Sequence, residues 1–236
     1  VVVANPGETY GDLGKVYVDE NGKQWVKLVS NVQNAATSYS FKNQIDTTSS
    51  FEIQGELDMS SMTAGGGIGI ILQPVNPQVA GVGEGSDASA DIGIYGQKDT
   101  TFIGFDGYVD SSKNDTSTGA LTIRQTNGNG DGFVNLTLDA SKSGASDNKV
   151  TASATSPTGP SIQTSYTTSV DTLFDLKWTP TGTDADGKST GSLTMTLYSA
   201  SDTSMQTPLY YLTVTNISLD TAESIALFGA FGGGGA

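Results

Sequence analysis

Residues 51–58 have the sequence FEIQGELD, in which apolar and polar side chains alternate. Phe51, Ile53 and Leu57 fall on one side of an extended chain, and the Glu, Gln and Asp side chains fall on the other. A period of two is typical of a strand with one face in a core and one face in water. The stretch therefore predicts a half-buried β-strand.

The same alternation recurs along the chain. It involves Val134, Leu136 and Leu138; Phe174, Leu176 and Trp178; Leu193, Met195 and Leu197; and Tyr210, Leu212 and Val214. The run through Ile68, Ile70 and Leu72 is more apolar and favours a central strand covered on both faces. Turns rich in Gly, Asn and Asp separate the strands at residues 19–22, 127–132 and 184–187. This pattern indicates an all-β sandwich, with one domain over residues 1–236.

Composition narrows the classes of function. The 236 residues include 25 acidic and 11 basic side chains, a formal net charge of −14, and neither Cys nor His. An acidic surface repels phosphate backbones, so we expect no nucleic-acid partner. Absent Cys excludes disulfides and thiolate sites, and absent His removes the usual general base. No apolar run reaches the length of a membrane span, so we expect no membrane insertion.

One acidic run has the spacing of a cation site. Asp106, Tyr108, Asp110 and Asp115 form the pattern D-x-Y-x-D-x4-D directly after apolar Phe102, Ile103 and Phe105. Ca²⁺ takes carboxylate and backbone carbonyl oxygens, and the segment from Gly107 has the residues to curl around an ion. A solvated turn that is rich in Asp is the alternative.

This run resembles the metal loop of L-type (legume-like) lectins, in which an F-D-x-Y-x-N-x4-D segment binds Ca²⁺. Two further segments agree in order and separation. Residues 65–72, GGGIGIIL, are similar to the Gly-rich strand of that family, and residues 224–233, SIALFGAFGG, are similar to its closing strand. The resemblance covers roughly residues 10–236 and is better to the lectin domains of Gram-positive adhesins than to plant lectins.

The resemblance implies a jelly-roll sandwich with one Ca²⁺ site. Asp106, Asp110 and Asp115 would supply carboxylates, and Tyr108 its main-chain carbonyl. The sugar site would be lined by Tyr108, Asp110, Gly66, Gly67, Tyr95 and Gly229. For Tyr95 a place at a sheet edge is the equal alternative.

The chain also departs from the family pattern. Gly66 stands where the family has the Asp that grips the sugar, and Asp110 stands where it has an Asn. Gly104 occupies the place of a Glu at the transition-metal site, so no Mn²⁺ site is expected. Trp25 and Trp178 both lie in alternating strands, which favours core positions over sugar platforms.

We therefore expect a calcium-dependent module, not an enzyme, that binds host or bacterial surface glycans and glycoproteins. It would be extracellular, at a cell surface or cell wall, as a segment of a larger exported precursor. One alternative is a structural or protein-binding stalk module that keeps the fold without sugar binding. The other is a glycan hydrolase or lyase that uses a carboxylate pair, for which Glu52 and Glu56 are ordinary neighbours on a polar face.

Overall fold

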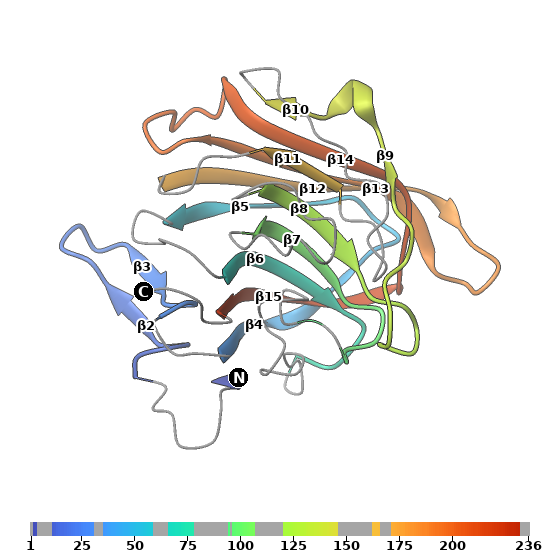
Figure 1. Ribbon diagram of the computed structural model, residues 1–236, viewed down its shortest axis with the longest axis horizontal. Coiled ribbons are helices and arrows are strands. Elements are labelled where there is room, and N and C mark those ends of the chain that lie inside the picture. The colour runs from blue at the N-terminus through green and yellow to red at the C-terminus, as the bar shows by residue number, and fades with distance from the viewer. Residues whose placement is uncertain are drawn as a thin grey trace.

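The chain folds into two β-sheets packed face to face, as the computed structural model in Figure 1 shows. The structure describes residues 2–3, 11–30, 35–58, 66–77, 94, 96–106, 120–145, 162–165 and 171–231. Within these ranges the chain forms strands and one short 3₁₀ turn at Ala140–Lys142, and no α-helix. The prediction of an all-β sandwich is confirmed.

In the described part of the chain, the first sheet has seven strands in the order β1-β4-β15-β6-β7-β8-β11. Their bounds are β1 Val2–Val3, β4 Ala35–Asp46, β15 Ala222–Phe231, β6 Gly66–Gln73, β7 Thr101–Asp106, β8 Ala120–Gln125 and β11 Ile162–Ser165. All neighbouring pairs in this sheet are antiparallel. The sheet therefore places the last strand of the chain beside the Gly-rich strand β6.

The second sheet has six strands, counted in the same ranges, in the order β10-β14-β13-β12-β5, with β9 paired to β14. Their bounds are β10 Gly144–Ala145, β14 Pro208–Leu219, β13 Ser189–Ser199, β12 Asp171–Thr183, β5 Phe51–Asp58 and β9 Thr137–Leu138. A separate hairpin joins β2 (Val16–Val18) to β3 (Gln24–Val26) and projects at the side of the sandwich (Figure 1).

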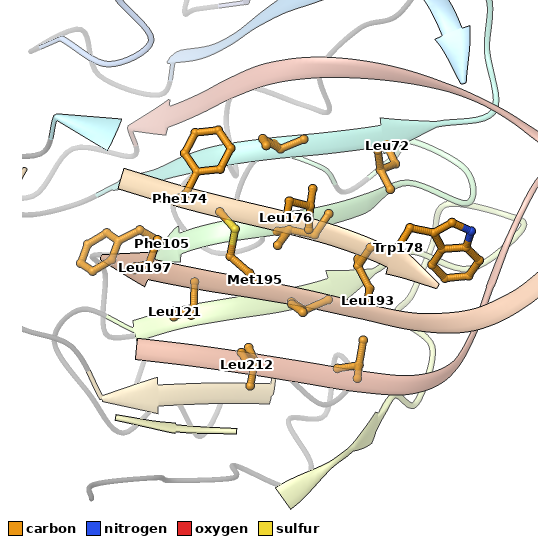
Figure 2. Close-up of a cluster of buried hydrophobic side chains, with 14 of the residues drawn as sticks. Leu72, Phe105, Leu121, Phe174, Leu176, Trp178, Leu193, Met195, Leu197 and Leu212 are labelled. Carbon is orange, nitrogen blue, oxygen red and sulfur yellow. The ribbon is translucent and has the colours of Figure 1, made fainter. Parts of the chain in front are cut away.

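The main core fills the space between the two sheets. Figure 2 shows Phe174, Leu176 and Trp178 of β12, together with side chains of β13 and β14, among Leu72, Phe105 and Leu121 of the first sheet. These positions are the inward members of the alternating strands, and burying apolar area is what holds the sheets together. Trp178 stacks on Phe51 at 6.5 Å between ring centroids and donates from Nε1 to the carbonyl of Thr47 at 2.7 Å.

A second apolar cluster lies on the outer face of the seven-stranded sheet. It contains Ile71, Phe102 and Phe228, with an edge-to-face contact between the two rings at 5.9 Å. Ile70 and Leu72 point into the main core while Ile71 points into this cluster, and all three are buried. The prediction that this strand is central and covered on both faces is confirmed.

Two predictions about elements are corrected by the structure. The alternation at Val134, Leu136 and Leu138 gives a strand of two residues only, β9 at Thr137–Leu138. Trp25 is not a core residue, because it lies half-buried on the β2–β3 hairpin. Leu136 and Leu138 still pack against the main core, although only Thr137–Leu138 pair with β14. The β2–β3 hairpin is a separate two-stranded sheet, and it leaves Trp25 half-buried.

Two facing glycines set the spacing of β6 and β7. Gly69 and Gly104 are paired across the two strands, and a Cβ on either would lie 2.6 Å from the Cα of the other. No side chain fits at that distance, so the close approach requires glycine at both positions. This packing accounts for glycine at position 104.

Candidate functional site

Three segments that are far apart in the sequence meet at one end of the seven-stranded sheet. Gly67 of β6 is paired with Asp106 of β7 on one side and with Ala230 of β15 on the other. Gly66 is paired with Phe231, the last residue of β15. Gly66, Gly67 and Asp106 are therefore neighbours along one edge of the sandwich, at the ends of adjacent strands.

The remaining predicted ligands lie outside the described residues. Asp106 is placed by its backbone, at the last position of β7. Tyr108, Asp110 and Asp115, which come after it in the sequence, and Tyr95, which comes before β7, are not among the described residues. In the ranges that the structure describes, no three Asp or Glu side chains are grouped so that they could hold a metal ion. The calcium site therefore stays a prediction about residues 106–115.

Gly67 and Gly229 are both buried. Gly229 is paired with Ile68 on β6 and Thr37 on β4, and a Cβ added to it would lie 2.5 Å from the carbonyl oxygen of Leu28. The chain after β3 thus crosses β15 at this glycine. Packing of this kind explains the small residue at position 229 without a ligand.

A carboxylate cluster occupies the edge of the other sheet, on its outer face. Asp171, the first residue of β12, is paired with Asp58 at the end of β5. Glu56 precedes Asp58 by two residues on β5, so both side chains lie on the same face of the sheet. Burial raises the pKa of Asp171 to about 6, and a hydrogen bond to Glu56 and the charges of Glu56 and Asp58 act in the same direction. The ammonium of Lys23 acts in the opposite direction and lowers the pKa of Asp171.

The β2–β3 hairpin supplies that ammonium. Lys23, next to the hairpin turn, forms an ion pair with Glu56, whose side chain is 14% exposed. The same ammonium lies 4.4 Å from the centre of the Trp25 ring. Trp25 in turn donates from Nε1 to the carboxylate of Asp19 at 2.9 Å. The hairpin tip is therefore fastened to the edge of the second sheet through one lysine.

A second titratable cluster lies at the opposite end of the sandwich. Glu223 of β15 is fully buried and accepts a hydrogen bond at Oε1 from the backbone N–H of Asp220 at 3.0 Å. Burial raises its pKa well above the usual value of 4.5, and the charge of Asp220 adds to this. Lys188 pairs with Asp99 at 2.9 Å and with Asp220 at 3.6 Å. This cluster joins loops of both sheets.

Sequence reasoning missed the Glu56–Asp171 pair and the role of Lys23. Glu56 was recognised as part of a polar strand face, but its neighbour across the sheet depends on the register of Phe51–Asp58 against β12. A strand's partner cannot be read from a single alternating pattern, because the pattern repeats in every strand. The one available signal was Asp171, an acidic residue three positions before Phe174, where the alternating run begins.

No protein-family model matches the sequence, and no curated protein matches it. In the described part of the chain, no helix has the length and apolar character needed to cross a membrane.

Proposed function

We propose that this chain is a calcium-dependent glycan-binding module with the jelly-roll fold of the L-type lectins, carried by a secreted or cell-wall-anchored bacterial protein. It acts by binding and not by catalysis. The partner is a surface glycan or glycoprotein of a host or bacterial cell.

The observation that carries the proposal is the meeting of β6, β7 and β15 at one end of one sheet. The resemblance to lectins rests on these three segments, and it requires them to be neighbours in space. Pairing of Gly67 with both Asp106 and Ala230 supports that requirement. A chance resemblance in three short motifs would not need the motifs to share an edge.

Calcium would have a structural task in this proposal. Asp106, Asp110 and Asp115 with the carbonyl of Tyr108 offer the hard oxygen ligands that Ca²⁺ prefers. The ion would hold the loop after β7 in one conformation, so that the Tyr108 ring meets a sugar without a further ordering cost. An excess of carboxylates over basic groups in the whole chain suits a cation and disfavours anionic partners.

Binding of the labelled protein to an array of neutral and sialylated oligosaccharides tests this function. We expect binding in Ca²⁺ that is lost in chelator and lost in Asp106→Ala. Asp186→Ala removes one exposed carboxylate from a hairpin turn and is the matched control, with binding unchanged. Binding that persists in chelator, or no binding of the wild-type protein to any glycan, would refute the proposal.

One observation favours a second candidate, a structural or protein-binding stalk module with the same fold. Gly66 offers no side chain for sugar hydroxyls, and Gly67 and Gly229 are buried. In that case the protein binds no glycan on the array, while Ca²⁺ still raises its folding stability. The two readouts together separate a lectin from a stalk module.

A further inference from the structure

The hairpin that projects from the sandwich presents two aromatic residues on one face. Tyr17 of β2 is paired directly with Trp25 of β3, so both side chains leave the two-stranded sheet on the same side. Tyr17 is 53% exposed, and Trp25 is half-buried. Adjacent rings on a small projecting sheet are unusual for a soluble surface, where large aromatic side chains are normally covered.

The Trp25 ring is held in place from two directions. Its Nε1 donates to Asp19 at 2.9 Å, and the Lys23 ammonium lies 4.4 Å from the ring centre. Lys23 is itself paired with Glu56 of β5. Because the ring is fixed before any ligand arrives, a ligand that stacks on this face loses less entropy on binding.

The hairpin lies at the same end of the molecule as Asp106, the first residue of the proposed calcium site. Figure 1 shows it beside the C-terminal ends of β5 and β15. Asp106 belongs to that end as well, because it is paired with Gly67, and Gly67 is paired with Ala230 near the end of β15. A ligand bound near Asp106 would therefore lie on the same side of the molecule as the hairpin.

We propose that the Tyr17–Trp25 face of the β2–β3 hairpin is a second contact surface for the glycan, in addition to the calcium loop. The inference rests on the proposed function. Aromatic rings cover the apolar C–H face of a pyranose, and neighbouring carboxylates accept hydrogen bonds from its hydroxyls. Asp19 and Glu56 are the carboxylates beside this face, and both are already oriented by the contacts of Trp25 and Lys23.

The charge of the surroundings selects among ligands. Lys23 is balanced by Glu56 and Lys27 by Asp12, and the carboxylates of Asp19, Asp58 and Asp171 outnumber the remaining Lys15. The area is therefore acidic overall and repels phosphate or sulfate groups. A neutral sugar chain satisfies both the rings and the hydrogen-bond acceptors, so we assign the surface to neutral sugar residues.

The test compares Tyr17→Ala with Val18→Ala. Both side chains are exposed, at 53% and 59%, and they are neighbours on one strand with opposite orientation, so neither substitution removes core packing. On an array of neutral and sialylated oligosaccharides, from disaccharides to hexasaccharides, we expect Tyr17→Ala to weaken binding about three- to tenfold, the range of one aromatic contact. Val18→Ala should bind as the wild-type protein does.

Tryptophan emission gives a direct readout of the hairpin. The chain has two tryptophans, and Trp178 is only 1% exposed, so acrylamide quenching reports mainly on Trp25. A neutral oligosaccharide identified on the array should protect the emission from quenching. The protection should be lost in Trp25→Phe.

The outcomes separate this inference from the proposed function. Loss of binding in Asp106→Ala together with full binding in Tyr17→Ala and no protection of Trp25 would leave the lectin proposal intact and overturn the hairpin surface. Binding that depends on Tyr17 but not on Asp106 or Ca²⁺ would support the hairpin and overturn the calcium-dependent site. A wild-type protein that binds no oligosaccharide overturns both.

Discussion

At the scale of single residues, Glu223 stands out as a carboxyl group inside the fold. Burial, followed by the charges of Asp220 and Asp99, raises its pKa well above 4.5, while the N–H of Asp220 and the charge of Lys188 lower it. The folded state therefore keeps a proton that the unfolded chain has released. Stability falls as the pH rises from about 4.5 towards the raised pKa, because the unfolded state binds fewer protons there.

Replacing Glu223 by Gln should remove this loss of stability. Gln retains an oxygen that accepts from the N–H of Asp220 and has no charge to bury. We expect Glu223→Gln to melt higher than the wild-type protein at neutral pH, with the difference vanishing near pH 4.5. Thermal melts across this pH range, with the exposed Glu20→Gln as control, measure it. A variant that melts lower at every pH would contradict the assignment.

The facing glycines of β6 and β7 make a second prediction at this scale. Gly104→Ala places a Cβ 2.6 Å from the Cα of Gly69, and backbone cannot move aside as a side chain can. We expect a loss of about 2–3 kcal/mol in the free energy of unfolding, measured in guanidinium chloride. Gly182→Ala, where the Cβ would lie 3.5 Å from Thr190 Oγ1, is the control and should change little. Equal effects at the two positions would refute the packing argument.

At the scale of elements, the β2–β3 hairpin and the edge of the second sheet interact electrostatically. Lys23 lowers the pKa of Asp171, which burial and the neighbouring Glu56 and Asp58 raise to about 6. The ammonium of Lys23, directly before β3, connects the hairpin to the β5–β12 pair. It gives the hairpin a defined place on the sandwich, although an ion pair with a partly exposed lysine contributes little to stability by itself.

Removal of Lys23 should therefore change the titration of a residue on another element. In Lys23→Ala we expect the pKa of Asp171 to rise above about 6, because the three carboxylates lose their nearest cation. Carbon-detected NMR of the Asp and Glu carboxyl groups measures this pKa. Lys15→Ala, in the same hairpin, should leave it unchanged. An unaltered or lower pKa in Lys23→Ala would show that the hairpin is not seated at this edge.

The sequence predicts elements well where alternation and a buried face coincide. The strands through Ile53, Leu176 and Met195 are present, and their inward side chains form the main core. Alternation overestimates the length of the strand at Val134–Leu138 and the burial of Trp25, because hydrophobic period alone does not tell how much of a segment a partner sheet pairs with or covers. The turns at residues 19–22 and 184–187 were predicted correctly. Gly22 and Gly187 both have a φ of 81°, a conformation that favours glycine.

At the scale of the whole molecule, the sequence predicted that the ends of β6, β7 and β15 lie together only because the three segments resemble those of lectins. Composition and alternation alone lead to a sandwich, not to the neighbours of β6. The pairing of β6 with both β7 and β15 arises from long-range register, which no local pattern encodes. The Glu56–Asp171 pair is absent from the sequence prediction for the same reason. The Tyr17–Trp25 pairing is local, across the predicted turn at residues 19–22, but the exposure of its face depends on where the hairpin sits on the sandwich.

The central claim is that Ca²⁺ bound after Asp106 stabilises the fold. The most direct test is thermal unfolding in Ca²⁺ and in chelator, for the wild-type protein, Asp106→Ala and the control Asp186→Ala. An ion present at about 100 times its Kd adds about 2.7 kcal/mol, which raises the Tm of a domain of this size by about 5–10 °C. We predict that rise for the wild-type protein and for Asp186→Ala, and none for Asp106→Ala. Identical melting of the wild-type protein in Ca²⁺ and in chelator would contradict the account.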